Sequence, residues 1–185
     1  MFGPERGRVL LLTARDGLVA QVGHDLTIEV SNWSAELIVA DDRTPTSLTV
    51  RVDLTSLVVR EGTGGVKPVT DRDRREIAVS ARKVLGVDRH PQATFTASTF
   101  EPGSNGSGFV QGTLALAGSE RPLRLHFAET GPHAYHATAA VRQSEFGIKP
   151  YTAFLGALKV SDTVGVSVDV QLSEPDAVHD STSEP

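Results

Sequence analysis

The segment TDRDRREIAVSARKVLGVDRHPQATF, residues 70–95, decides the fold because it carries the clearest helical period in the chain. Four apolar side chains share one face of a 3.6-residue repeat: Ile77, Ala81, Val84 and Leu85. Thr70 is a typical N-cap, and Asp73 stands where the carboxylate of a capping box belongs. Gly86 can end the helix, and Pro91 prevents its resumption. The sequence therefore predicts one helix over about 70–85.

On both sides of this segment, apolar and polar residues alternate as they do in half-buried strands. The clearest case is 163–172, where Val or Leu occupies every second position. Eight or nine such segments follow one another with short links, and each has one apolar face. Such a set either pairs into a sandwich or closes into a barrel, and closure would remove the exposed strand edges. We expect an all-β protein with one crossover helix.

Length, net charge and cysteine content further restrict the kinds of protein that this chain can be. The 185 residues suit one domain, which we place at 1–172, followed by a disordered acidic tail at 173–185. The net charge of −5 argues against nucleic-acid binding, which usually needs a basic surface. The chain has no cysteine, so disulfides and thiolate chemistry are excluded. The apolar run Val9–Leu12 is too short for a signal peptide or a membrane span, which predicts a cytoplasmic protein.

Three parts of the chain, read in order, resemble the YceI family, the lipocalin-like polyisoprenoid-binding proteins. In chain order they are DLTSLV (53–58) with TDRD (70–73), HPQATF (90–95) with VQGTL (110–114), and QSEFGI (143–148). With the closing strand, the likeness covers about 17–172 and rests on the order and spacing of these motifs. Arg75 departs from the family, which often has His there.

The resemblance implies a closed eight-stranded antiparallel lipocalin-like barrel around an elongated apolar cavity, with the helix packed at its side or end. It also implies binding of a long isoprenoid or another amphiphile without catalysis. Small inward-facing residues would leave room for the ligand tail: Gly112, Ala137 and Ala139. The alternative is that these small residues fit a tapering, filled core. The alternation alone favours the filled core, and the resemblance favours the cavity.

Two further positions are candidates for contact with a ligand. His24 and Asp25 interrupt a strand after Gly23, so they could form a polar pair that fixes a headgroup at the cavity mouth. The alternative is a histidine beside a carboxylate in an ordinary turn. Trp33 could stack on a ligand or could simply fill the core, with its indole N–H satisfied.

A second group combines a cation with aromatic rings. Arg142 precedes Phe146, and Tyr151 and Phe154 follow in a less regular stretch. A cation beside aromatic rings at a barrel rim would suit a phosphate-headed lipid. The alternative is a solvated arginine beside a loop that packs on the core.

Few other residues of the sequence suggest a metal site, a phosphate-binding loop or a catalytic nucleophile. His133 and His136 are three residues apart in a strand, so they point to opposite faces and predict no metal site. The Gly-rich stretch 62–65 lacks the lysine of a P-loop, and no nucleophile elbow appears. We therefore expect neither a cofactor nor catalytic residues.

Three functions remain as hypotheses. The leading one is a non-catalytic carrier or storage protein that holds a polyisoprenoid or fatty lipid in the barrel. The second is a stress-linked structural or interaction module with a filled barrel, and the third is an enzyme that works through His24 and Asp25. The partners considered are an apolar or lipid ligand and a second copy in a homodimer, and no nucleic acid is expected.

Overall fold

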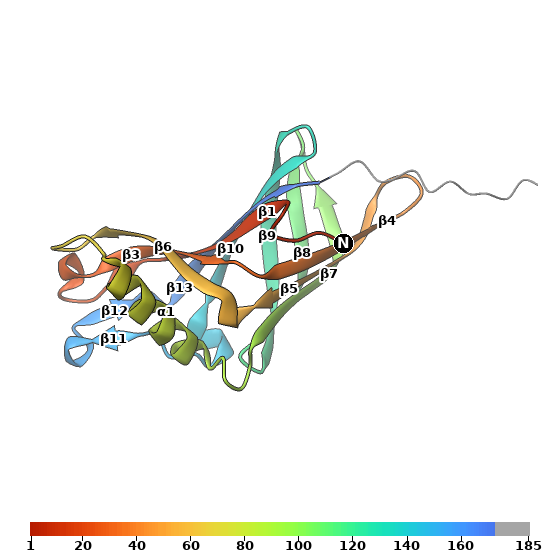
Figure 1. The fold of residues 1–185 in the computed structure, drawn as a ribbon. Coiled ribbons are helices and arrows are strands. Elements are labelled where there is room, and N and C mark those ends of the chain that lie inside the picture. Colours follow the sequence, from red (N-terminus) through yellow and green to blue (C-terminus); the bar gives the residue numbers. More distant parts are fainter. Residues whose placement is uncertain (173–185) are drawn as a thin grey trace, which may run out of the picture.

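The computed structural model describes residues 1–172, so the tail predicted at 173–185 lies outside the described residues. The longer strands of the first half are β1 (Gly7–Thr13), β3 (His24–Val30), β4 (Trp33–Val39), β5 (Pro45–Asp53) and β6 (Leu57–Gly64). Those of the second half are β7 (Gln92–Pro102), β8 (Ser107–Leu116), β9 (Ser119–Gly131), β10 (Ala134–Arg142) and β13 (Thr163–Gln171). These ten strands pair antiparallel in the order β4-β5-β7-β8-β9-β10-β13-β1-β3-β6, and the sheet curls strongly around its apolar face (Figure 1).

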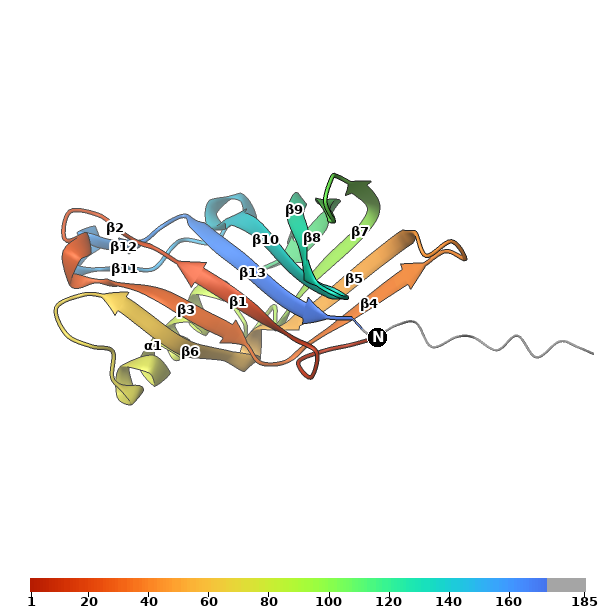
Figure 2. The same ribbon diagram turned by 90° about the horizontal axis from the view of Figure 1, so that it is seen from above.

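Shorter elements gather at one end of this sheet. Strands β2 (Arg15–Asp16), β12 (Leu158–Val160) and β11 (Thr152–Ala153) form a separate three-stranded sheet. The 3-10 turns are η1 (Ala20–Val22), η2 (Leu54–Ser56), η3 (Gln143–Phe146) and η4 (Phe154–Gly156). Figure 2 shows the small sheet at the end of the molecule where the far ends of β3 and β6 also lie.

Helix α1 (Asp71–Leu85) confirms the prediction made from its caps and its apolar face. The Thr70 side chain accepts a hydrogen bond from the Asp73 N–H, and the Asp73 carboxylate accepts one from the Thr70 N–H. Gly86 ends the helix at φ 66°, a left-handed conformation that glycine adopts without steric cost. The helix connects β6 to β7 and packs against β6 (Figure 1).

The predominance of strands and the single α-helix of residues 1–172 are confirmed, but closure into eight strands is not. The sheet has ten strands, and its order ends at β4 and β6, which form no ladder with each other in the described part of the chain. The chain bends at two places between neighbouring strands: β3 continues into β4 after Ser31 and Asn32, and β5 continues into β6 through η2. Between these two bends the Ser31 N–H donates to the Ser56 carbonyl at 3.2 Å.

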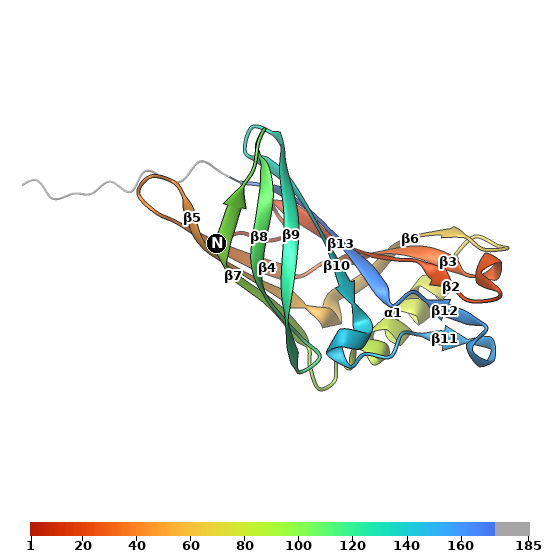
Figure 3. The same cartoon turned by 180° about the vertical axis from the view of Figure 1, so that it is seen from behind.

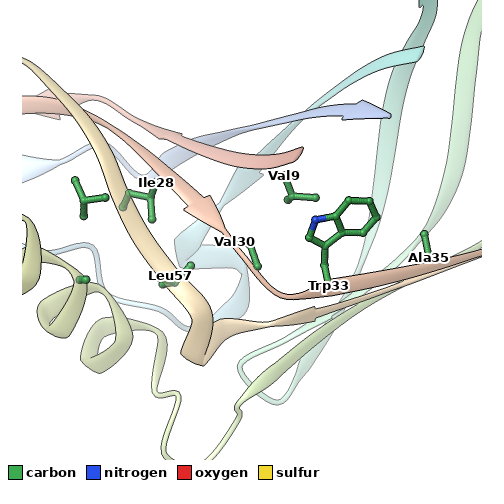
Figure 4. Close-up of a cluster of buried hydrophobic side chains, with 8 residues drawn as sticks. Val9, Ile28, Val30, Trp33, Ala35 and Leu57 are labelled. Atoms are coloured by element: carbon green, nitrogen blue, oxygen red, sulfur yellow. The ribbon is translucent and has the colours of Figure 1, made fainter. Parts of the chain in front are cut away.

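Buried side chains form three separate clusters around the inside of the sheet. The first includes Val9, Val30, Trp33 and Leu57, and α1 adds Ala78 to it. In Figure 4 the Trp33 ring points from β4 toward Val9. The second cluster, which contains Phe146 and Ile148, lies near η3, and the third contains Phe95, Ala97 and Val110.

The two ends of the curled sheet are built differently. We call the end with the short turns at 40–44, 103–106 and 132–133 the hairpin end. We call the opposite end, which carries the small sheet, the loop end. Its three tip loops are residues 17–23, 64–69 and 151–159. Figure 3 shows, from behind, that β2, β11, β12 and the far end of β6 all lie at this end.

Candidate functional site

The space enclosed by the sheet is a cavity of about 1120 Å³ with a largely apolar lining. Every strand of the large sheet contributes side chains to it, for example Val9, Ile28, Leu37, Val50, Leu57, Phe95, Leu114, Leu125, Ala139 and Val168. Helix α1 adds Ile77, Ser80, Ala81, Val84 and Leu85. The apolar face that predicted the helix therefore forms part of the cavity wall as well as part of the core.

The cavity extends along the length of the sheet. At the hairpin end its lining includes Pro45 and Leu172, which lie next to the turns. At the loop end it includes Val66, Phe154 and Leu158 from the tip loops. An elongated apolar space of this volume suits a long, narrow ligand better than a compact polar one.

Charged and polar groups of the lining gather at the loop end. The ring nitrogen Nε2 of His24 lies 2.8 Å from the Lys67 carbonyl oxygen, which ties β3 to the loop after β6. Lys67, Lys159 and Arg15 also line the cavity there. A cavity that is apolar along its length and charged at one end can hold an apolar tail and place a polar headgroup at the mouth.

His24 and Asp25, which the sequence predicted to act as a pair, contact different groups. Asp25 accepts a hydrogen bond from the Arg15 N–H at 2.8 Å, and its carboxylate lies 3.7 Å from the Arg15 guanidinium. His24 bonds to the Lys67 carbonyl and lines the cavity. Neighbouring residues in a strand point to opposite faces, which explains the division.

The small residues predicted to face inward differ in their surroundings. Ala137 and Ala139 line the cavity from β10. Gly112 is not among the lining residues. A Cβ atom at position 112 would lie 2.3 Å from the Thr96 carbonyl oxygen and 2.8 Å from the Phe95 ring, so glycine is needed there for close packing. The alanines of β10 therefore border the cavity, whereas Gly112 makes room for a neighbouring ring.

Trp33 belongs to both the core and the cavity. Only 5% of its surface is exposed, and its ring meets the Phe2 ring edge-on with centroids 6.1 Å apart. The same side chain lines the cavity near Val30 and Ala35. Trp33 therefore packs in the core and also faces the cavity, and its contact with a ligand stays a prediction.

The four residues predicted at the rim lie in three different places. Tyr151 and Phe154 line the cavity in a tip loop. Phe146 is buried in the second cluster. Arg142 is exposed and lies 3.6 Å from Glu145 and 3.8 Å from Asp162. Alternation along β10 explains the last case, because inward Val141 turns its neighbour outward.

A second, smaller space of about 670 Å³ lies between the end of α1 and residues 146–152. Phe146 lines it together with the basic side chains of Lys83, Arg89, His90 and Lys149. Basic groups near the last turn of a helix complement its dipole. We therefore ascribe these charges to the helix end.

The N-terminus of α1 places a carboxylate with a lowered pKa near the cavity mouth. Hydrogen bonds from the Thr70 hydroxyl and N–H lower the pKa of Asp73, with smaller contributions from the charges of Arg72 and His24. Asp73 lines the cavity, so the capping carboxylate at this side of the mouth is held in its charged form.

Residues 1–172 contain neither a cluster of metal-ligating side chains nor a helix that could span a membrane. No three His, Cys, Asp or Glu side chains of this part gather as a metal site requires. Within the same residues, no helix has the length and apolar character to cross a bilayer.

The family is decided by a match of the YceI-like domain to residues 13–172. The chain belongs to the YceI-like family. Among curated proteins, none matches the sequence. The family expectation made from the three motifs is thereby confirmed over most of the described chain.

Solved structures of this family share the fold at low sequence identity. The crystal structure of BcnA from Burkholderia cenocepacia superposes with a TM-score of 0.64 at 14% identity, covering 90% of this chain and 96% of that one. The YCEI protein from Campylobacter jejuni gives a TM-score of 0.62 at 16% identity, covering 80% of this chain and 85% of that one. At these identities the likeness establishes the fold alone.

Proposed function

We propose that this YceI-like protein binds a long-chain amphiphile, such as a polyisoprenoid or a fatty lipid, as a carrier or storage protein without catalysis. The observation that carries the proposal is the cavity of about 1120 Å³, lined by apolar side chains from every strand of the large sheet and from α1. Burial of an apolar tail there would supply about 0.8 kcal/mol per methylene as an upper estimate. The alternative of a filled barrel lacks support from this interior.

The binding site that we propose has a tail region and a headgroup region. Trp33, Ala137 and Ala139 line the tail region. His24, Tyr151 and Phe154 surround the headgroup region at the loop end. Gly112, Arg142 and Phe146 do not line the cavity, and the proposed site is built without them.

We also propose that the curled sheet functions as a closed barrel. What supports closure is that β3 runs into β4 and β5 runs into β6, while β3 pairs with β6 and β4 with β5. Counted as one bent hairpin, these four segments become two long strands, and the ten strands become eight. The Asp53 N–H donates to the Asn32 carbonyl at 3.0 Å and so continues the pairing through the bend.

The direct test combines native mass spectrometry of freshly purified protein with thermal unfolding in the presence of isoprenoid alcohols of increasing length. The proposal predicts a one-to-one complex and a melting temperature that rises with chain length until the cavity is full, because a ligand that binds only the folded state stabilises it. Absence of both bound lipid and any shift across the series would contradict it. A cytoplasmic location and a homodimer stay predictions, and the same mass spectrum reports the subunit count.

A further inference from the structure

Large apolar side chains are exposed in unusual number at the loop end. Six of the eleven that are exposed in residues 1–172 belong to the tip loops: Leu18, Val22, Val66, Tyr151, Phe154 and Leu155. Leu18 is 91% exposed, Val66 74% and Phe154 68%. Scattered exposed apolar residues are normal, but a group on three neighbouring loops marks a contact surface.

Bonds between the tip loops make them one surface around the cavity mouth. The Val19 N–H donates to the Ala157 carbonyl at 3.1 Å, which joins the first loop to the third. The bond from His24 to the Lys67 carbonyl fixes the second loop beside the start of β3. Val22, Val66 and Phe154 are at once exposed and part of the cavity lining. The exposed surface is therefore continuous with the cavity.

The backbone at residues 154–156 turns apolar side chains toward solvent in an unfavourable conformation. Phe154, Leu155 and Gly156 have φ values of 50°, 55° and 87°. Large non-glycine residues rarely adopt the left-handed region because Cβ approaches the backbone. Leu155 is fully exposed, so the described chain offers no internal packing that would compensate for its conformation. Conformations of this kind concentrate at functional sites.

The charge of the tip loops is opposite in sign to that of the whole chain. They contain Lys67 and Lys159 and no carboxylate, whereas the chain as a whole carries −5. Asp16 lies just before the first loop and opposite Lys159 in the ladder. Apolar side chains mixed with lysines are typical of protein surfaces that bind at the interface of an anionic bilayer.

We propose that the tip loops dock the protein onto the surface of an anionic lipid bilayer, with Phe154 and Leu155 entering the interface and the cavity mouth facing the lipid. This inference rests on the proposed function, because docking would let an amphiphile pass between bilayer and cavity without exposing its tail to water. The lysines would meet lipid phosphates at the level of the headgroups.

A second copy of the chain is the weaker candidate for this surface. In a twofold contact the same patch would face itself and bring the lysines of both copies together. A dimer interface also needs complementary shape, which a bilayer interface does not.

The experiment is flotation of the full chain with vesicles of phosphatidylcholine and phosphatidylglycerol in equal parts. We expect Phe154→Ser combined with Leu155→Ser to weaken vesicle binding by roughly tenfold or more, because two large apolar side chains no longer enter the lipid. The matched control is Ile38→Ser combined with Val39→Ser, two adjacent exposed apolar residues at the hairpin end, which should bind as the unchanged chain does. Equal binding by the two double variants, or no binding by the unchanged chain, would overturn docking.

Charge is tested by Lys67→Gln combined with Lys159→Gln. This variant should lose roughly 25-fold in binding to the anionic vesicles, since each of the two cations near such a surface contributes about fivefold, and almost nothing with phosphatidylcholine alone. A loss of the same size on both vesicles would contradict the role of the lysines.

Uptake of a fluorescent fatty acid without vesicles separates docking from the proposed function. Uptake without flotation overturns docking and leaves ligand binding intact. Flotation without uptake supports docking and contradicts ligand binding. It would then also contradict the transfer of an amphiphile between bilayer and cavity. A dimer that the Phe154 and Leu155 substitutions dissociate, in a chain that does not float, assigns the surface to a second copy and overturns the bilayer.

Discussion

The hairpin end and the loop end both place residues in the left-handed region, but with different residue types. At the hairpin end these are Arg43, Asn105 and His133, with φ values of 66°, 56° and 57°. At the loop end Phe154 and Leu155 adopt similar values. Polar side chains at tight turns are solvated by water, whereas phenylalanine and leucine are not. The difference between the turn residues of the two ends is what the proposed docking of the loop end on an apolar surface would require.

The largest stability difference between the two ends should come from glycines with matching backbones. Gly65 and Gly106 have φ values of 71° and 70°. Either substitution by alanine should cost about 1–2 kcal/mol from the left-handed backbone. A Cβ at position 65 would also lie 2.3 Å from His24 Nε2, so Gly65→Ala should lose roughly 1 kcal/mol more with the bond to Lys67. Urea unfolding measures both variants, and equal losses would show that His24 does not hold the loop.

Removal of the helix cap should have the next largest effect. Thr70→Ala deletes the acceptor for the Asp73 N–H and should destabilise the protein by about 1 kcal/mol. The control is Thr46→Ala at the hairpin end, where an exposed hydroxyl donates to the Ile38 carbonyl, with an expected change within about 0.5 kcal/mol. Thermal unfolding distinguishes them, and a larger loss for Thr46→Ala would contradict the importance of the capping box.

Relief of the strained tip should stabilise the protein slightly. Leu155→Gly removes the steric conflict of a left-handed leucine, partly offset by the greater flexibility of glycine when unfolded, for a net gain of about 0.5–1 kcal/mol. Asn105→Gly at the hairpin end should change stability little, because asparagine tolerates this region. The same Leu155 variant should bind vesicles less well. A loss of stability in Leu155→Gly would show that the side chain packs on the protein.

The smallest effect should be a loss of stability at low pH in the first turn of α1. The Thr70 hydroxyl and N–H lower the pKa of Asp73 in the folded state, so its contribution to stability is present above the unfolded pKa and is lost as pH falls through the folded one. Asp42, in a hairpin turn, has its pKa lowered chiefly by the Thr44 N–H. Hydrogen exchange should show that acid loosens the first turn of α1, and that Asp73→Asn removes this dependence while Asp42→Asn does not. An unchanged acid response in Asp73→Asn would contradict the assignment.

Sequence patterns predicted the features that local chemistry decides. The caps and the apolar face of α1 depend on residues within a few positions, and both the helix and its capping box are confirmed. The alternation along β10 was enough to predict that Arg142 points outward, because Ala137, Ala139 and Val141 occupy the inward positions. Contacts distant in sequence could not be predicted. The burial of Phe146 and the close approach of Phe95 to Gly112 depend on strands and turns that only the folded sheet brings together.

The loop end was the least predictable region. The less regular stretch that holds Tyr151 and Phe154 contains β11 and η4. Strand β12 pairs with β11 and also with β2, more than a hundred residues earlier in the chain. Pairs so distant leave no periodic signal in short strands of two or three residues. For the same reason Leu18, Val66 and Leu155 gave no sign that they lie around one opening.

The central claim is that the interior is hollow and takes an apolar chain, and two adjacent alanines of β10 test it most directly. Ala139 faces the cavity, and Ala140 is exposed on the other side of the same strand. Native mass spectrometry with a long isoprenoid alcohol should show that Ala139→Trp lowers its affinity by roughly tenfold or more, since each methylene displaced from the cavity forfeits about 0.8 kcal/mol. Ala140→Trp should bind as the unchanged chain does. Equal binding by both variants would contradict the claim that the ligand lies inside the sheet.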